Sequence, residues 1–339
     1  MTERKLASIQ RIAEIKPIPE ADLICAYRIN GWWVVSKVNE FKVNDLVVYL
    51  EVDSFVPTEL AHFLSKGKEP SVYNTIKGER LRTIRLKKQV SQGLILSIDS
   101  CISAKGCWSS LQEDQDVSEW LGVTKWEKPE GFIAAHTKGN FPSFIPKTDQ
   151  ERIQNLKYDF NTWQDKGMLF EKTEKIDGSS ITVFVYNELQ GVCSRNLELK
   201  EDFDNSWWKL AQNHDIINKI KQTGRNLAVQ GEIYGSSING NLYKLNDQRF
   251  MVYDIYDIDN RTYLLPDERW KLVEQLGLPH VPLVGFGVLV GSPSDLLDDA
   301  EGKSTINQDC IREGYVYKSM SDSNVSFKCI SNAYLLKHE

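Results

Sequence analysis

The sequence predicts an α+β protein of two domains, in which a small β-barrel precedes a larger domain built on antiparallel sheets with flanking helices. Three observations lead to this prediction. A chain of 339 residues is natural for two domains. Short apolar strands separated by turn residues dominate the first part, whereas the second part alternates strands with helices. The glycines, prolines and charges between them indicate a linker at 126–145, so the predicted domains are 1–125 and 146–339.

Composition restricts the class of protein. Hydrophobic residues make up 41% of the chain and charged residues 26%, as in ordinary soluble globular proteins. A net charge of -6 excludes attraction to nucleic acid through overall charge and leaves only local basic patches. Six cysteines without a CxxC pair and five dispersed histidines argue against a zinc site or a disulfide framework. Without a signal peptide or a bilayer-spanning run, we expect a cytoplasmic or nuclear protein with no membrane partner, and a monomer by default.

The first domain contains enough short strands for a small barrel. Strand-like segments cover 7–18, 23–37, 45–57 and 80–98, and Asn30-Gly31 is a turn signal inside the second of them. A short helix is expected over 58–64, with Thr58 as its N-cap after Pro57. Short strands with one helix and irregular loops favour an OB-fold, and a β-sandwich remains the alternative.

The second domain begins with an expected hairpin over 168–187, whose turn is the sequence "EKIDGSS". An amphipathic helix is predicted over 205–222, since Trp207, Leu210, Ile217 and Ile220 recur at helical spacing. A second helix is predicted over 294–303. Further strands are expected at 191–196, 226–235, 249–258, 313–320 and 325–331.

Two stretches resemble nucleotide-binding motifs by chance. "EGKST" at 301–305 ends like a P-loop, but the required earlier glycine falls on Leu297. "GFGVLVG" at 285–291 has the wrong spacing for a dinucleotide fingerprint and lies inside a strand-like run. We therefore expect no phosphate site at either stretch.

A series of polar residues interrupts the apolar strands of the second domain. Singly, each has an ordinary explanation as a surface or core residue, and "EKIDGSS" alone fits a solvated hairpin turn. Together they fit a sheet that lines a cleft with alternate side chains. The residues are Lys175, Asp177, Arg195, Glu232, Tyr253, Asp254, Glu313 and Lys328.

These residue types suit a reaction at phosphorus. Lys175 could be a nucleophile if its pKa were lowered, which nearby cations and desolvation would do. Carboxylates are the oxygen ligands that Mg²⁺ or Mn²⁺ prefers. Lys328 and Arg195 offer positive charge to phosphoryl oxygens, and Tyr253 offers a flat face on which a purine could stack.

The motifs and their order resemble the covalent lysyl-nucleotidyltransferases, the superfamily of polynucleotide ligases and mRNA capping enzymes. "EKIDG" matches their KxDG nucleophile motif, and "SRN", "GE", an aromatic-Asp pair, "EG" and a late lysine follow in family order from Lys175 to Lys328. In DNA ligases and capping enzymes an OB domain follows the last motif, whereas here the barrel comes first. That order, with "RLRTIRLKKQVSQGLIL" and "SFKCISNAYLL", resembles ATP-dependent RNA ligases that seal 3′-OH/5′-phosphate nicks.

The resemblance implies a role for each motif residue. Lys175 would form lysyl-AMP. Glu232 and Glu313 would bind the ribose or the water shell of Mg²⁺ or Mn²⁺, and Asp177 would bind that shell. One departure is Ile330, which stands where many ligases have a second lysine, and Arg152 is a candidate to compensate. The residues expected to bind ATP or AMP are Arg152, Glu174, Asp177, Gly178, Arg195, Glu232, Tyr253, Glu313 and Lys328.

The resemblance also gives a meaning to a basic run in the first domain, which would grip nicked duplex with an RNA 3′-OH strand. A charged edge strand that prevents aggregation is the alternative for this run. The basic residues of this run are Lys77, Arg80, Arg82, Arg85, Lys87 and Lys88.

The function of the whole chain has three alternatives. They are a DNA ligase, a capping-type guanylyltransferase, and a nucleic-acid-binding protein with a degenerate ligase fold.

Overall fold

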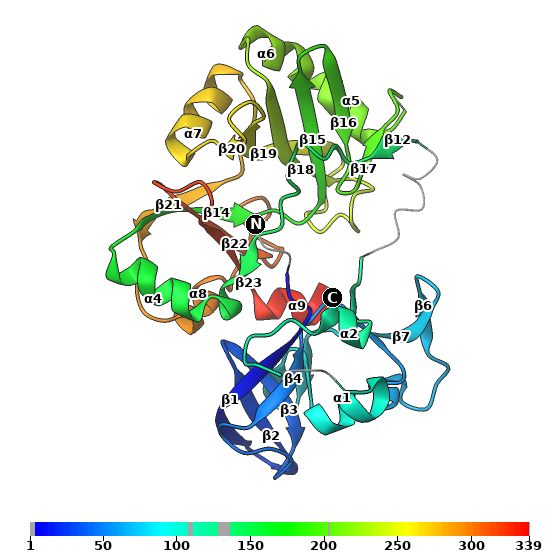
Figure 1. Ribbon diagram of the computed structural model, residues 1–339. Helices are drawn as coiled ribbons and strands as arrows, with labels where there is room; N and C mark the ends of the chain where they lie inside the picture. Colours follow the sequence, from blue (N-terminus) through cyan, green and yellow to red (C-terminus); the bar gives the residue numbers. More distant parts are fainter. Residues whose placement is uncertain (1–3, 108–110, 128–135, 203, 339) are drawn as a thin grey trace. The chain divides into compact units, whose positions relative to one another are not determined.

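The computed structural model describes residues 4–107, 111–127, 136–202 and 204–338 (Figure 1). The chain forms two compact units. The N-terminal unit comprises residues 1–129 with the short segments 153–157 and 335–339, and the C-terminal unit comprises 130–152 and 158–334. Among the described helices, none is both long and apolar enough to cross a membrane.

Antiparallel strands build the N-terminal unit, as its alternating sequence predicts. They are β1 (Ala7–Ile18), β2 (Ala21–Ile29), β3 (Trp32–Lys37), β4 (Leu46–Leu50), β5 (Ser54–Pro57), β6 (Ser71–Tyr73), β7 (Ile76–Arg80), β8 (Ile84–Leu86), β9 (Gln89–Ser91), β10 (Leu94–Leu96) and β11 (Thr124–Lys125). One sheet has the order β10-β4-β1-β2-β3 and another the order β11-β5-β7-β6, while β8 and β9 form a hairpin. Asn30, with φ 50°, makes the predicted turn between β2 and β3.

Apolar side chains fill this unit in two clusters. One contains Ile9, Val48 and Leu50, and the other gathers around Trp32, which is fully buried. The adjacent Trp33 lies outside the core, with Lys16 Nζ 3.9 Å from the centre of its ring. Of the two tryptophans, Trp32 therefore serves packing.

The helix predicted over 58–64 is shorter and later than expected. The chain forms a single 3₁₀ turn, η1 (His62–Ser65), with no side-chain cap. Thr58 instead donates its backbone N–H to the Lys77 carbonyl and so prolongs the pairing of β5 with β7. The helices α1 (Ile98–Lys105), capped by Ser97, and α2 (Ser118–Leu121) complete this unit.

Two sheets build the C-terminal unit. Their strands are β12 (Thr137–Asn140), β13 (Glu151–Arg152), β14 (Leu169–Lys175), β15 (Ser179–Tyr186), β16 (Leu189–Cys193), β17 (Leu197–Leu199), β18 (Leu227–Gly235), β19 (Gln248–Asp257), β20 (Thr262–Tyr263), β21 (Leu283–Val288), β22 (Gly314–Ser319) and β23 (Ser326–Ile330). The larger sheet has the order β12-β17-β16-β15-β18-β19-β20, and the smaller one has the order β13-β23-β22-β14-β21. All neighbours are antiparallel except β13 and β23. The predicted α+β class on antiparallel sheets is confirmed.

The segment predicted as a linker is partly built into the larger sheet. Residues 137–140 form β12, which pairs with β17. Residues 128–135 of that segment lie outside the described part of the chain.

The hairpin predicted over 168–187 is wrong in an informative way. β14 pairs with β21 and β22, whereas β15 pairs with β16 and β18, so the two strands belong to different sheets. The Asp-Gly signal marks a sharp turn correctly, but it cannot show whether the flanking strands pair with each other. Residues 176–178 therefore carry the chain from one sheet to the other.

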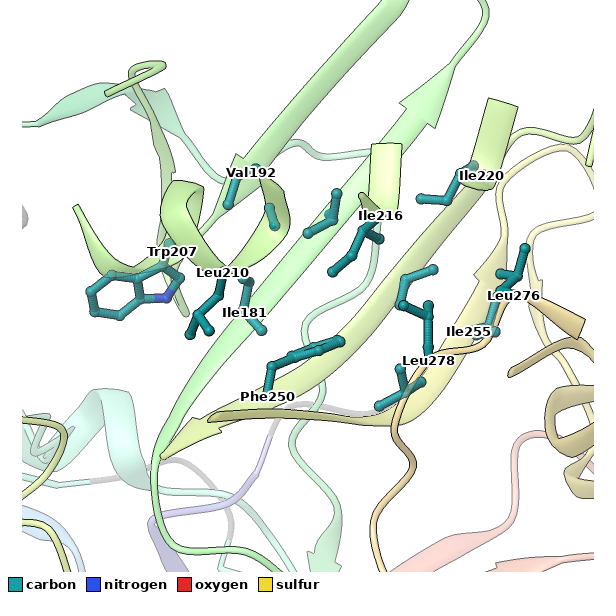
Figure 2. Close-up of a cluster of buried hydrophobic side chains, with 14 of the residues drawn as sticks. Ile181, Val192, Trp207, Leu210, Ile216, Ile220, Phe250, Ile255, Leu276 and Leu278 are labelled. Carbon is teal, nitrogen blue, oxygen red and sulfur yellow. The ribbon is translucent and has the colours of Figure 1, made fainter. Parts of the chain in front are cut away.

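The helices of this unit are α4 (Lys157–Asp165), α5 (Ser206–Asn213), α6 (Ile216–Gln222), α7 (Pro266–Gln275) and α8 (Pro293–Asp299). The last helix, α9 (Asn332–His338), begins in this unit, and its residues from 335 onward belong to the N-terminal unit. The single helix predicted over 205–222 is broken in two, because Asp215 adopts a left-handed conformation with φ 52°. Trp207, Leu210 and Ile220 pack on the larger sheet as predicted, and Figure 2 shows them with Ile216. Ile216 is fully buried, whereas the predicted Ile217 is only partly buried against the same cluster.

Candidate active site

Lys175 lies at the junction of the two sheets in the C-terminal unit. It ends β14 opposite Gly314 of β22, and its Nζ lies 2.9 Å from Oε1 of Glu313. Gly178 in the following turn is required by close packing, since a Cβ there would lie 2.2 Å from the Ile233 carbonyl oxygen. This close approach places β18, and with it Glu232, beside the lysine.

Three carboxylates surround the amine. Glu313 directly precedes β22, Glu232 lies on β18 and Asp177 lies in the turn, and all three act electrostatically on Lys175. The Asp177 backbone N–H donates to Tyr243 Oη at 2.8 Å, and the Asn239 amide donates to its carboxylate. Hydrogen bonds with Tyr243 and Asn239 therefore fix the turn at Asp177.

The pKa of Lys175 departs from the sequence-based expectation. Partial burial alone would lower it, but the negative charges of Glu313, Glu232 and Asp177 outweigh that effect and raise the pKa well above 10.5. The lysine is thus protonated in the free protein, and the expectation of a lowered pKa is wrong for that state. A nucleophilic role requires something that cancels the carboxylate charge.

Two of the carboxylates are buried, and one of their oxygens lacks a hydrogen-bond partner. Burial raises the pKa of Glu232 to about 8 and also raises that of Glu313. Glu313 Oε2 is buried and makes no hydrogen bond to any described residue. No group of three or more acidic, His or Cys side chains in the described residues is arranged to hold a metal directly. These observations suit a divalent cation that is held largely through water.

Two positive side chains act on these carboxylates. Lys328 Nζ lies 2.9 Å from Asp149 Oδ1, and Arg195 Nη2 lies 3.4 Å from Asp149 Oδ2. Lys328 acts electrostatically on Glu313 and Arg195 on Glu232, which places both near the same centre. Arg152 is buried on β13, paired with Lys328 in the parallel ladder.

Tyr253 of β19 is the last member of the group, and other residues hold it in place. Its Oη lies 2.8 Å from Thr148 Oγ1, and burial together with the charge of Glu232 raises its pKa to about 12. Lys318 Nζ donates to the Tyr253 carbonyl at 2.6 Å and lies 2.6 Å from Asp254 Oδ2. The tyrosine is therefore fixed at both its ring hydroxyl and its backbone.

Comparison with known proteins agrees with this geometry. An RNA ligase family model matches residues 169–330, and an OB-fold domain model matches residues 6–98. A mutant of Naegleria gruberi RNA ligase with AMP and Mn is 44% identical, covers 99% of each chain and superimposes with a TM-score of 0.91. The chain belongs to the RNA ligase family. Another mutant of that protein, with ATP and Mn, covers 98% of this RNA ligase and 99% of its own chain at 44% identity and a TM-score of 0.91.

A third solved structure, Naegleria gruberi RNA ligase with PPi, is also 44% identical, covers 99% of both chains and has a TM-score of 0.91. A comparison with curated proteins found no match. The predicted OB domain and the recognised family of this RNA ligase are thus confirmed.

One candidate residue of the RNA ligase has its side chain occupied elsewhere. The buried Glu174 carboxylate accepts hydrogen bonds from Ser304 Oγ, from Thr305 N at 2.9 Å and from Thr305 Oγ1 at 2.6 Å. Successive strand residues point to opposite faces, so Glu174 points away from the face that presents Lys175. The "EGKST" stretch, which we set aside as a P-loop, anchors this strand through its Ser and Thr.

The sequence did not single out a buried ionic network beneath the tyrosine. Arg269 of α7 is fully buried, pairs with the buried Glu171 carboxylate and donates to His280 Nε2 at 3.0 Å. Its Nη1 lies 3.7 Å from Asp254, which also binds Lys318. Burial and the charge of Arg269 lower the pKa of His280 to about 3, so this histidine is neutral. The network connects α7 to the strands that carry the candidate site.

The predicted site residues therefore fall into three groups. Lys175, Asp177, Glu232, Glu313, Arg195, Lys328 and Tyr253 are linked by direct contacts or by charge, with Gly178 and Arg152 beside them. Glu174 turns elsewhere. The basic run is divided. Arg80 pairs with Asp53 at 2.5 Å and lies over the ring of Trp126 inside the N-terminal unit. The other members are exposed, namely Lys77, Arg82, Arg85, Lys87 and Lys88.

Proposed function

We propose that this RNA ligase seals 3′-OH/5′-phosphate nicks in duplex with an RNA 3′-OH strand, using ATP and a lysyl-AMP intermediate. The observation that carries this proposal is the single lysine held by three carboxylates, beside two cations and a fixed tyrosine. Naegleria gruberi RNA ligase, of the same family, has been solved with ATP and Mn and with PPi.

Each step is a displacement at phosphorus. First, neutral Lys175 Nζ bonds to the α-phosphorus of ATP, pyrophosphate leaves and the amine loses a proton to solvent. Next, an oxygen of the 5′-phosphate attacks that phosphorus, and the P–N bond breaks as the lysine regains a proton. Finally, the 3′-OH oxygen attacks the 5′-phosphorus, its proton is lost and AMP leaves. Lys328 and Arg195 would hold phosphoryl oxygens in place, and Tyr253 would stack on adenine.

Asp177, Glu232 and Glu313 would hold Mn²⁺ or Mg²⁺ through its waters. When bound, the cation neutralises carboxylate and phosphate charge. The protein keeps these carboxylates close to Lys175, and their negative charge raises the pKa of the lysine. Neutralising that charge would therefore lower the pKa of Lys175. Arg152 and the backbone of Glu174 are further candidates for ATP contacts.

Two assays test the function. Intact-protein mass, on protein first stripped of AMP, should show an adenylate adduct with ATP and none with GTP. Nicked duplexes with ribose or deoxyribose on the 3′-OH side should then separate RNA sealing from DNA sealing, with clear preference for ribose. An adduct with GTP alone would indicate a guanylyltransferase, equal sealing of both nicks would remove the strand preference, and no adduct with either nucleotide would favour a binding protein.

The β8–β9 hairpin is the part of the basic run that we propose contacts the RNA backbone. Arg85, Lys87 and Lys88 are exposed on it. Each phosphate contact adds about 0.9 to the slope of log affinity against log salt. The triple variant Arg85→Ala/Lys87→Ala/Lys88→Ala should therefore weaken binding to nicked duplex and flatten that slope by roughly 2–3.

A charge-matched variant controls for total charge. Lys37→Ala/Lys42→Ala/Lys68→Ala removes three other exposed lysines of the same unit. If both triple variants flatten the slope equally, the hairpin has no special role.

We further propose a reducing location, cytoplasmic or nuclear, because all six cysteines are free.

A further inference from the structure

The strand β21 leaves one side of the smaller sheet open. It is the last strand in the order β13-β23-β22-β14-β21, and within the described residues no strand pairs with its outer edge. Figure 1 shows it, in orange, at the margin of the sheet beside β14. A free edge presents a row of backbone N–H and C=O groups that can pair with another strand.

This edge lacks two of the features that normally prevent pairing, since residues 283–290 include no charge and no proline. Its one irregularity is at Val284, which the pairing of β21 with β14 skips. Its side chains are apolar and exposed: Val284 43%, Phe286 51%, Val288 51% and Val290 71%. Leu169 of β14, opposite Val288, is 44% exposed and extends the same patch. A patch of this kind marks an interaction surface.

The two glycines of β21 leave open space beside the strand. Gly285 and Gly287 lie opposite Lys172 and Phe170, and nothing lies within 4 Å of where a Cβ would be at either position. No steric demand of this chain requires glycine there. A cavity of about 420 Å³ opens at this place, lined also by Leu296 and Tyr317. Glycine inside a strand weakens it and often marks the approach of another backbone.

The sequence of the strand is symmetric about its central residue. Val284-Gly285-Phe286-Gly287-Val288 is the same in both directions about Phe286. An antiparallel copy centred on Phe286 places glycine opposite glycine and valine opposite valine, and the absence of charge means that no like charges meet. We propose that β21 pairs with β21 of a second copy of this chain, which joins the two smaller sheets across a two-fold axis.

This inference differs from the monomer expected from the sequence, and it does not depend on the proposed reaction. The paired part of β21 lies along Leu169–Thr173, whereas the catalytic candidate Lys175 lies beyond it on β14. Dimerisation and ligation can therefore be measured separately.

The first test is sedimentation equilibrium of the full chain. We expect a concentration-dependent dimer for the wild type. Phe286→Lys should raise the dimer dissociation constant by about 100-fold or more, because the two introduced charges would face each other on the axis. Leu189→Lys, at a residue 59% exposed on β16, should leave the dimer unchanged. A wild-type monomer at all concentrations, or a dimer that survives Phe286→Lys, would overturn the proposal.

The second test fixes the register. The background variant Cys107→Ser removes the one exposed cysteine, while the other five are buried. Directly opposed residues of antiparallel strands have Cα atoms about 4.5–5.5 Å apart, within reach of a disulfide. Phe286→Cys should therefore cross-link to itself, whereas Val284→Cys should cross-link only when mixed with Val288→Cys. Self-linking of Val284→Cys without linking of Phe286→Cys would contradict the two-fold axis, and an edge occupied only by a different protein would overturn self-pairing.

Discussion

Lys175→Met is expected to abolish the adenylate adduct and to reduce ATP-dependent nick sealing on the order of 10⁴-fold or more, as removal of a covalent nucleophile does. The side chain that forms the P–N bond is lost, and the other lysine that acts on Glu313, Lys328, is paired with Asp149. Methionine is similar in length to lysine, so the packing of β14 is largely kept. Intact mass with ATP measures the first step, and gel separation of sealed strands measures the whole reaction.

The same variant separates chemistry from folding. The last step needs no lysyl-AMP, so a nick supplied with a preformed 5′-adenylate should still be sealed by Lys175→Met. Lys209→Met, on the exposed side of α5, is the matched control and should retain activity. If Lys175→Met still forms the adduct, or if Lys209→Met loses it, Lys175 is not the nucleophile.

Arg269→Met is expected to lower the free energy of unfolding of the C-terminal unit by about 3–5 kcal/mol, because it leaves a buried carboxylate without its cation. Glu171 and Arg269 are both fully buried. Trp270 Nε1 would still donate to Glu171, but a hydrogen bond does not neutralise the charge. Urea denaturation of the purified variant measures the loss.

A second substitution tests this explanation. Arg269→Met/Glu171→Gln removes the charge and keeps an acceptor for Trp270, so it should recover more than half of the lost stability. Arg249→Met breaks an exposed pair with Asp247 and should match the wild type. If the double variant is no more stable than Arg269→Met, the cost arises from packing and not from the unpaired charge.

The sequence singled out residues that the structure brings together, although it did not predict how the strands around them pair. Lys175, Asp177, Glu232, Glu313 and Lys328 could be found because each interrupts an apolar strand, and they do converge. The order of the motifs along the chain carried this information.

Three features could not be predicted, each for a physical reason. A turn signal is local, so "EKIDGSS" could not show that β14 and β15 belong to different sheets. The pKa of Lys175 depends on the balance of burial and charge, and that balance needs distances. Asp149 and Thr148 lie in an irregular stretch without periodicity, so no pattern singled them out. Lys318 of the buried ionic network was also missed, although it had a signal in the sequence. In "EGYVYKSM" it is a cation inside an apolar strand.

The ion pair between Lys175 and Glu313 has a chemical consequence outside the reaction. Acylating agents, aldehydes and cyanate react only with the neutral form of an amine, whose lone pair attacks them. Because the surrounding carboxylates keep Lys175 protonated, the resting protein presents these electrophiles with an inert ammonium group. The charges that delay the lysine from reacting with its own substrate also protect it from irreversible modification between turnovers.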